Sequence, residues 1–563
     1  MKQFLIFPFI LAFFPLSSIA QTVPSEGYHS PIGIPLVLSA NFGELRPNHF
    51  HMGVDFKTNN KIGYNLYSIT DGFVSRIKVS PYGYGKVVYI DHPNGITSVY
   101  AHCSEFKGTV DSIVRATQER EQNYEVEIFP KKNEISLKKG DVFALSGNTG
   151  SSTAPHLHFE IRDTKTEAAM NPLVFGFDVA DSKAPEIRGV KVYSLTNDGY
   201  RIPGKSTVRT VTKGTYGYYV GGDKITLPSN FCTKSGGIGI AIDVIDRLDG
   251  APNQCGLYGS ILIVNGDTIF GQKTDRVPFE STRYVNSHTD YEDYSLSSKK
   301  YHKCFKTTQN SLPIYDYGTN GVLKCAPGDV LKIVYIAFDP KGNKTELKFD
   351  IEVSAGAINP QDGIAIDLTY LQPGYSLQLE SDKRKVEFGI ETVYEPLQLN
   401  ESKLNTEIGT AAEPVHNAFK IKVKSAENPD GKQYIEMITE KGRRRTMMAD
   451  YQDGWFFAES KYFGRYTLKR DTIPPTISTL NFKETITFTT ASKLTWKIVD
   501  GQTDISDYDI FIDDKWYLIE YESKGSYVTF DRPADMIGSK ELKLIVTDQA
   551  GNSSTWAKVI EFK

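Results

Sequence analysis

Short stretches of alternating hydrophobic and polar residues dominate this chain, and such stretches predict β-strands. Within residues 62–102, VVYIDH (87–92) and ITSVYAH (96–102) flank Pro93-Asn94-Gly95. The Asn-Gly step favours the tight turn of a hairpin. Residues 137–162 also contain short hydrophobic stretches separated by turn residues, and they end in HLHFEIR. The pattern therefore predicts a β-core in the first third of the chain.

One segment between these strands has the spacing of a helix instead. In residues 109–123, four residues recur at helical intervals: Val110, Ile113, Val114 and Thr117. We expect this helix to belong to an insertion, spanning about residues 104–136, that lies on the β-core.

Beyond residue 180 the chain contains a weak internal repeat. KAPEIRGVKV (183–192) resembles IPPTISTLNF (473–482), and each is a proline-led entry into a strand. IVYIAFDPKGNKTELKF (333–349) resembles KLIVTDQAGNSSTWAKV (543–559), and each is two strands joined by a D-x-x-G-N turn. Two copies of one β-sandwich module are the simplest account of both similarities.

These patterns predict a mainly all-β chain of several domains. The length of 563 residues agrees with three or four domains, at roughly 150 residues for each. The predicted boundaries are 1–20 for a signal segment, 21–180 for an N-terminal domain, 181–355 for an Ig-like β-sandwich, 356–470 for a β-rich sandwich-like domain and 471–563 for a second Ig-like β-sandwich.

Composition and charge exclude several other classes of protein. Hydrophobic residues make up 40% of the chain and charged residues 23%, so the chain can build cores and is not disordered. With 64 basic and 68 acidic residues the net charge is −4, so charge does not draw the chain to nucleic acid. The 46 Gly and 27 Pro suit short strands and turns, and they argue against a coiled coil, a helical solenoid or a polytopic membrane protein.

The first twenty residues have the features of an export signal. Lys2 precedes an apolar run, and the small residues Ser18 and Ala20 mark a cleavage site after Ala20. The alternative is a membrane anchor, but the run is shorter than the ~20 residues of a span, and Pro8 and Pro15 interrupt it. We therefore expect a mature chain without a transmembrane helix, in the periplasm, on the cell envelope or outside the cell.

Export would bring the five cysteines into oxidising conditions. Cys103 stands alone in the N-terminal part, and the other four lie in the next domain. Proximity in the sequence favours Cys232–Cys255 and Cys304–Cys325, although three pairings of these four are possible.

Three short fragments of the N-terminal domain contain histidines, and two of the three also contain a carboxylate. The fragments are H-M-G-V-D (51–55), Y-A-H (100–102) and H-L-H-F-E (156–160). Residues two or four apart on a strand share a face, so His51 would point the same way as Asp55, with Gly53 leaving space between them. On the same grounds His156 would share a face with His158.

This combination of residues suits a metal site. Two imidazoles and one carboxylate at a concave surface fit a catalytic zinc ion, which takes three protein ligands and keeps one position for water. Two further imidazoles would remain to move protons near that water. His102 is expected at the end of its strand, on the face of Ser98 and Tyr100. A single strand histidine is more often a core or surface residue, but three fragments in one short domain favour the metal.

The order of the fragments resembles the LytM/lysostaphin-type zinc peptidases, the Peptidase_M23 family. The resemblance rests on H-x3-D, then Y-A-H, then GNTGSSTAPHLHFE (147–160), and covers roughly residues 30–175. It implies a small antiparallel β-fold with a groove that hydrolyses peptide bonds in peptidoglycan cross-links or glycine-rich peptides. The insertion at 104–136 departs from compact family members, and it could wall the groove, restrict the substrate or act as a lid.

The resemblance also implies a role for each motif residue. His51, Asp55 and His158 would be the ligands of a Zn²⁺ ion. His102 and His156 would be the catalytic residues that flank the water. One of this pair would assist deprotonation of the water, and together they would stabilise the tetrahedral intermediate and protonate the leaving amine.

Three neighbours of the motif residues are expected to have other roles. Glu160 stands two residues past His158 on the same strand face, so it should support the metal site rather than act as the base. His49 lacks the spacing to Asp55 that the motif requires. Cys103 should be a small buried residue that faces away from the site.

We therefore expect an exported zinc metalloendopeptidase that acts on peptidoglycan, with C-terminal sandwiches that bind the cell wall or an envelope protein. The alternative is a non-catalytic LytM-like regulator of other cell-wall hydrolases, although such proteins typically lack one or more of the five residues. A third hypothesis is an adhesion protein, because β-sandwiches make up most of the chain. The sequence leaves open which peptide bond is cleaved and what the C-terminal domains bind.

Overall fold

The structure, a computed structural model, describes residues 27–563 except 223, 235, 317–318, 358–369 and 484–487. Its elements are mostly antiparallel strands, and a helix occupies the expected insertion. The prediction of a mainly β fold is confirmed. The expected signal segment, residues 1–20, lies outside the described residues. Among the residues described, none of the helices has both the length and the apolar character of a membrane span.

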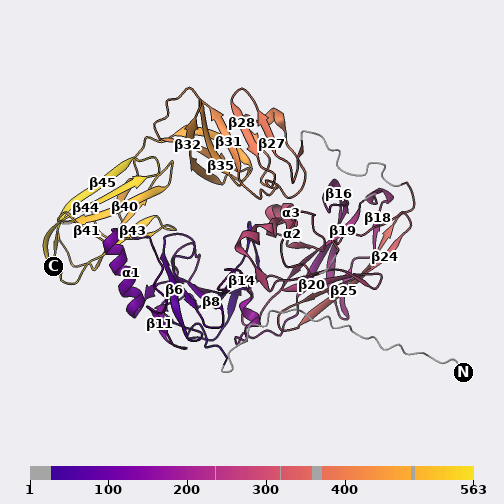
Figure 1. The fold of residues 1–563 in the computed structure, drawn as a ribbon, viewed down its shortest axis with the longest axis horizontal. Helices are drawn as coiled ribbons and strands as arrows, with labels where there is room; N and C mark the ends of the chain where they lie inside the picture. Colours follow the sequence, from indigo (N-terminus) through magenta and orange to yellow (C-terminus); the bar gives the residue numbers. More distant parts are fainter. Residues whose placement is uncertain (1–26, 223, 235, 317–318, 358–369, 484–487) are drawn as a thin grey trace.

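The described chain forms four β-rich units that follow one another around a ring (Figure 1). We name them the N-terminal domain (27–180), the second module (181–357), the third module (370–470) and the C-terminal module (471–563). The C-terminal module lies beside the N-terminal domain and exchanges hydrogen bonds and an ion pair with it, so the last unit contacts the first.

The N-terminal domain is built on a sheet with the order β1-β4-β13-β8-β7-β6-β10, so β4, β13 and β8 are neighbours. On one face, buried side chains such as Phe56, Tyr100 and Phe159 form the core. The elements of the domain are β1 (Leu38–Ala40), β2 (Leu45–Arg46), β3 (His49–Phe50), β4 (Val54–Lys57), β5 (Asn65–Tyr67), β6 (Gly72–Val79), β7 (Lys86–Asp91), β8 (Ile96–Cys103), β9 (Glu105–Phe106), α1 (Gly108–Glu121), β10 (Val126–Ile128), β11 (Ser136–Leu137), β12 (Val142–Leu145), β13 (His156–Asp163), β14 (Ala169–Met170) and the 3-10 helix η1 (Pro172–Val174).

Helix α1 is the helix that the sequence predicts in the insertion. Val110 and Val114 are buried in the domain core, and Ile113 packs against the core at its edge, as the helical spacing indicates. In Figure 1 the helix lies next to the C-terminal module, so the insertion fills space between two units of the ring.

The second module is joined closely to the N-terminal domain. Strand β22 pairs with β14, and the side-chain amide of Asn41 both donates to and accepts from the backbone of Gly256. The elements of the module are β15 (Glu186–Leu195), β16 (Arg201–Gly214), β17 (Gly217–Val220), β18 (Lys224–Leu227), η2 (Ser229–Phe231), β19 (Gly237–Ile245), β20 (Gly259–Val264), β21 (Asp267–Lys273), β22 (Arg276–Val277), η3 (Phe279–Tyr284), α2 (Val285–His288), α3 (Tyr291–Ser297), β23 (Tyr301–Lys303), β24 (Val330–Phe338) and β25 (Lys344–Val353).

The third module has its core between a five-stranded and a four-stranded sheet. Its buried aliphatic and aromatic residues come from strands of both sheets, which is the arrangement of a β-sandwich. Its elements are β26 (Tyr370–Leu371), β27 (Leu377–Glu380), β28 (Arg384–Phe388), β29 (Leu397–Gln398), η4 (Glu401–Lys403), β30 (Glu407–Ile408), β31 (Phe419–Lys424), β32 (Gln433–Ile438), β33 (Arg444–Met448), β34 (Asp450–Gln452), β35 (Trp455–Ser460) and β36 (Gly464–Arg470).

The C-terminal module is a second sandwich, in which two sheets of orders β37-β39-β43-β42 and β38-β45-β44-β40-β41 enclose Trp496. Its elements are β37 (Thr476–Thr479), β38 (Phe488–Thr489), β39 (Lys493–Val499), β40 (Ile505–Ile512), β41 (Lys515–Tyr517), β42 (Glu520–Glu522), β43 (Tyr527–Asp531), β44 (Gly538–Asp548) and β45 (Ser553–Phe562).

The two D-x-x-G-N segments of the sequence repeat have the same local structure. Each joins two antiparallel strands, β24 to β25 and β44 to β45. In each, the asparagine amide donates to the aspartate carboxylate, from Asn343 to Asp339 at 2.6 Å and from Asn552 to Asp548 at 2.9 Å. Each of these aspartates also lies near two further aspartates, with ligand atoms within 4.8 Å of one another: Asp181, Asp246 and Asp339 in one group, and Asp471, Asp500 and Asp548 in the other.

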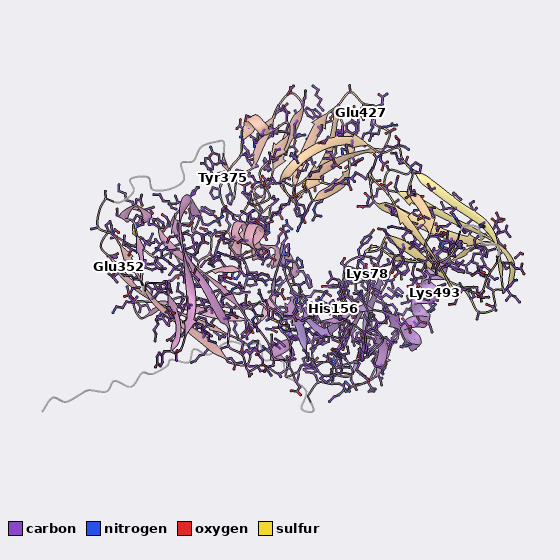
Figure 2. All side chains as sticks on the ribbon, turned by 180° about the vertical axis from the view of Figure 1, so that it is seen from behind. Lys78, His156, Glu352, Tyr375, Glu427 and Lys493 are labelled. Atoms are coloured by element: carbon purple, nitrogen blue, oxygen red, sulfur yellow. A yellow bond between two sulfur atoms is a disulfide. The ribbon has the colours of Figure 1, made fainter. Side chains whose placement is uncertain are left out.

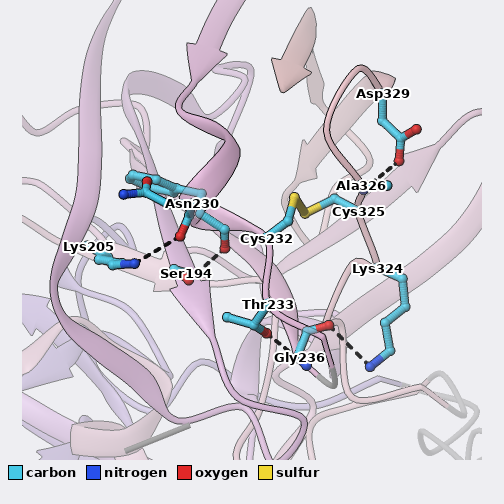
Figure 3. The surroundings of a disulfide bond; sticks show 11 residues. Ser194, Lys205, Asn230, Cys232, Thr233, Gly236, Lys324, Cys325, Ala326 and Asp329 are labelled. Atoms are coloured by element: carbon cyan, nitrogen blue, oxygen red, sulfur yellow. Dashed lines mark hydrogen bonds between the residues drawn. A yellow bond between two sulfur atoms is a disulfide. The ribbon is translucent and has the colours of Figure 1, made fainter. Parts of the chain in front are cut away.

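The disulfide of the second module joins Cys232 to Cys325 (Figure 3). The two pairings favoured by proximity in the sequence are therefore wrong. The reason is a contact between distant segments, because the backbones of Ile238 and Leu323 exchange two hydrogen bonds of 2.9 Å and bring the two cysteines together. Cys255 and Cys304 are buried in different hydrophobic clusters as free thiols.

We predict that a non-reducing digest of the purified protein yields one cross-linked peptide pair, containing Cys232 and Cys325. Cys103, Cys255 and Cys304 should react with an alkylating reagent only after unfolding, because all three are buried. Mass spectrometry of the digest checks both statements. A link from Cys232 to Cys255 would contradict this arrangement of strands.

Candidate metal centre

The three histidine-containing fragments meet at the centre of the N-terminal sheet. Asp55 lies on β4, His156 and His158 on β13, and His102 on β8, and these three strands are neighbours. Asp55 and His158 are direct register partners. His51 lies just before β4 rather than on a strand, and it reaches the same place. The pairing of the strands thus brings together all five residues that the sequence singles out.

His51, Asp55 and His158 form a tight triangle of potential ligand atoms. His51 Nε2 lies 3.1 Å from Asp55 Oδ1 and 3.1 Å from His158 Nδ1, and the last two atoms are 2.9 Å apart. All three side chains are buried. Gly53 allows this closeness, because a Cβ there would lie 2.5 Å from Phe159 O. Nitrogen and carboxylate ligands that share one small space fit a single metal ion.

The other ring nitrogen of each ligand histidine is held by an acceptor. His51 Nδ1 donates to the backbone oxygen of Asn41 at 2.8 Å, and His158 Nε2 donates to Glu160 Oε1 at 2.8 Å. A carbonyl or carboxylate oxygen can only accept, so the hydrogen is on this outer nitrogen. The inner nitrogen is then the one that a metal ion can bind, after displacing any proton on it.

His102 and His156 are oriented in the same way. His102 Nδ1 donates to Thr149 O and His156 Nδ1 donates to Ala154 O, each at 2.8 Å. The two rings are 4.8 Å apart, and His156 Nε2 lies 3.4 Å from Asp55 Oδ1. Both rings therefore turn Nε2 toward the cleft, and in a neutral imidazole held in this way Nε2 is the nitrogen that can accept a proton.

The backbone at His102 differs from the expectation for a regular strand. Strict alternation would place His102 on the face of Tyr100, which packs in the core against Phe143 and Phe159. Instead, β8 has an irregular register against β7 at this point, and His102 has a φ of 61°. This bulge turns His102 to the opposite face. The expectation that His102, Ser98 and Tyr100 share a face was therefore wrong, although the predicted meeting of the histidines holds.

Charges around the site favour a cation at its centre and a neutral imidazole beside it. Burial alone would lower the pKa of His158, but its hydrogen bonds to Asp55 and Glu160 raise the pKa to about 9. Burial and the neighbouring His158 and His156 lower the pKa of His102 to about 3. His102 is therefore neutral at physiological pH.

Glu160 is the centre of a buried network behind His158. Its two oxygens accept from His158, from the Tyr84 hydroxyl at 2.5 Å and from Arg162 Nε at 2.6 Å. Burial would raise the pKa of Glu160, but Arg162 and His158 lower it to about 2, so the side chain is a carboxylate. The contacts agree with the supporting role expected for Glu160. Sequence reasoning missed Tyr84, whose ring also stacks on His158, and its only signal was the turn Y-G-Y-G.

The other two neighbours also lie as expected. His49 is exposed, and its Nδ1 donates to Pro47 O rather than pointing to the site. Cys103 is fully buried in the core, and burial raises the pKa of its thiol to about 12. Neither takes part in the centre.

The five residues line one cleft of 710 Å³. Most of its lining residues are polar, including Arg46 and Lys57, and Asn253 contributes from the second module. In Figure 2, His156 marks this region of the N-terminal domain. Among the described residues, none of the 104–136 insertion lines the cleft. The insertion borders the C-terminal module instead of covering the site.

Residues 49–119 match the family model described as Peptidase family M23. An uncharacterized metalloprotease of Haemophilus influenzae is 34% identical over 131 residues, which are 23% of this chain and 21% of the relative. The peptidoglycan DD-endopeptidase ShyB of Vibrio cholerae is 32% identical over 111 residues, 20% of each chain. Residues 49–119 are therefore similar to an M23 peptidase domain, and the N-terminal domain that contains them is called the M23 domain below.

These two relatives match 23% and 20% of this chain, and the chain spans about a fifth of the length of each relative. Among solved structures, the catalytic domain of lysostaphin from Staphylococcus simulans is 24% identical, with 25% of this chain and 91% of that chain covered and a TM-score of 0.19. The similarity in sequence to these relatives thus covers only part of the chain.

We predict that Glu160→Gln lowers the zinc affinity of the M23 domain about 10- to 100-fold, because His158 loses a charged partner that fixes its tautomer. Competition with a chelating dye measures this affinity. Glu167→Gln is the matched control, since Glu167 pairs with the same Arg162 but is largely exposed, and it should bind zinc as the wild type does. Equal affinities for the wild type and Glu160→Gln would show that the network behind His158 has no effect on the metal.

Proposed function

We propose that this protein is a zinc metalloendopeptidase that hydrolyses peptide bonds in peptidoglycan. The observation that carries the proposal is the convergence of four imidazoles and one carboxylate in one cleft, each imidazole with its outer nitrogen held by an oxygen acceptor. The names of relatives, including the peptidoglycan DD-endopeptidase of Vibrio cholerae and lysostaphin, support the substrate class.

In this proposal His51, Asp55 and His158 hold the zinc ion. Zinc, when bound, supplies a Lewis acid that lowers the pKa of a coordinated water to about 7. Two imidazoles and one carboxylate suit this ion better than Mg²⁺ or Ca²⁺, which prefer all-oxygen sites.

His102 and His156 would carry out the proton transfers. Each presents Nε2 to the cleft, so a neutral ring of the pair can accept the proton of the attacking water. The resulting imidazolium can donate that proton to the leaving amine. Thr149 O and Ala154 O hold the two rings in place during both transfers.

The proposed place of action is outside the cytoplasm. Peptidoglycan lies there, and the disulfide between Cys232 and Cys325 is typical of an oxidising compartment. The expected signal segment supports the same conclusion.

We predict that His102→Ala retains one bound zinc but loses at least about 100-fold in peptidoglycan hydrolysis, because it removes a proton-transfer group and no ligand. His51→Ala should lose both zinc and activity. His49→Ala, which changes an exposed histidine two residues from His51, should lose neither. The measurements are metal analysis of each variant and mass spectrometry of the muropeptides that it releases.

The same experiment separates the alternative function. A wild-type protein that binds zinc, releases no muropeptides and stimulates a second hydrolase would be a regulator. Undiminished hydrolysis by His51→Ala would reject the ligand assignment.

A further inference from the structure

The C-terminal module touches the loop that orients both candidate catalytic histidines. This loop, residues 147–155, connects β12 to β13 along the edge of the cleft. Two of its backbone oxygens, Thr149 O and Ala154 O, accept the hydrogen bonds that fix His102 and His156. A shift of the loop would therefore move two hydrogen-bond acceptors on which the orientation of those rings depends.

Lys524 is the residue of the C-terminal module that contacts this loop. It lies in the turn between β42 and β43, and its ammonium donates to Asn148 O at 2.5 Å and to Ser152 O at 3.0 Å. These two oxygens stand on either side of the Thr149–Ser151 segment. One charged group thus ties together both ends of the segment that carries Thr149 O.

The turn is held in place by several other contacts. Ser523 Oγ donates to Pro81 O at 2.6 Å, and Glu520 pairs with Lys86 at 2.9 Å. Leu518 and Tyr508 pack against the hydrophobic core of the N-terminal domain. The C-terminal module is therefore docked on the M23 domain by both apolar and polar contacts. These contacts fix the position of the turn that carries Lys524.

One side of the loop packs closely against the backbone of the M23 domain. Gly150 has a φ of +71°, and a Cβ there would lie 2.3 Å from Gly85 N. The backbone nitrogen of Ser151 donates to Gly83 O at 2.8 Å. The backbone of the Thr149–Ser151 segment packs directly on the backbone of Gly83 and Gly85. The ammonium of Lys524 holds the same segment from its other side.

We propose that Lys524 is a positioning residue for the candidate catalytic histidines, and that the C-terminal module therefore completes the active site of the M23 domain. The inference rests on the proposed function. Lys524 does not touch the cleft's five residues. It acts through Thr149 O and Ala154 O, which hold His102 and His156 with their proton-accepting nitrogens toward the substrate.

The test compares Lys524→Met, Lys524→Arg and Lys543→Met in the full chain. Lys543 is an exposed lysine on β44 of the same module and serves as the matched control. The readouts are hydrogen–deuterium exchange of residues 147–155, zinc content, the thermal midpoint, and kcat and KM for release of muropeptides.

We expect Lys524→Met to exchange faster at residues 147–155 and to lower kcat about tenfold, since misplacement of catalytic groups by a fraction of an ångström has effects of this order. KM, zinc content and the thermal midpoint should match the wild type. Lys524→Arg should recover most of kcat, because a guanidinium can also donate to two carbonyls. Lys543→Met should behave as the wild type.

Unchanged exchange in Lys524→Met would overturn the inference, and so would faster exchange with an unchanged kcat. A kcat loss that Lys524→Arg does not recover, together with a lower thermal midpoint, would also overturn it, because the effect would then be a loss of stability. A wild-type protein without hydrolytic activity would reject the proposed function itself, which is a separate result.

Discussion

The candidate metal centre depends on one electrostatic constraint: four imidazole nitrogens and one carboxylate face one another in one cleft. Lone pairs and a carboxylate repel at such distances unless a cation or protons lie between them. Asn41 O, Glu160, Thr149 O and Ala154 O enforce the arrangement, because each holds the outer nitrogen of one imidazole. The strand order, the bulge at His102 and the close approach at Gly53 together bring these imidazole nitrogens and the carboxylate into one place.

The four units of the ring are joined by strand pairing, ion pairs and hydrogen bonds, and not only by the linkers between them. Strand β22 of the second module extends the N-terminal sheet through β14, and Arg201 and Lys303 of that module pair with Glu395 of the third. The C-terminal module returns to the M23 domain through Lys524 and its neighbours. These contacts favour a role of the modules in positioning the M23 domain, beside any role in binding the cell wall.

Local patterns predicted a large part of the molecule. Alternation and turn residues indicated a mainly β chain, helical spacing indicated α1, and the spacing of three fragments indicated the residues of the centre. Features that depend on distant segments could not be predicted in this way. The disulfide partner of Cys232 is 93 residues away and is set by strand pairing. The bulge at His102 breaks the alternation on which strand reasoning rests, and Lys524 reaches the loop from another module.

The most direct measurement of the central claim is anomalous X-ray diffraction at the zinc absorption edge from crystals of the zinc-loaded full chain. We predict one strong peak within about 2.0–2.2 Å of His51 Nε2, His158 Nδ1 and an oxygen of Asp55. His102 and His156 should lie near the peak without ligating it. A zinc ion bound elsewhere, or a centre where these three atoms do not share the metal, would contradict the account.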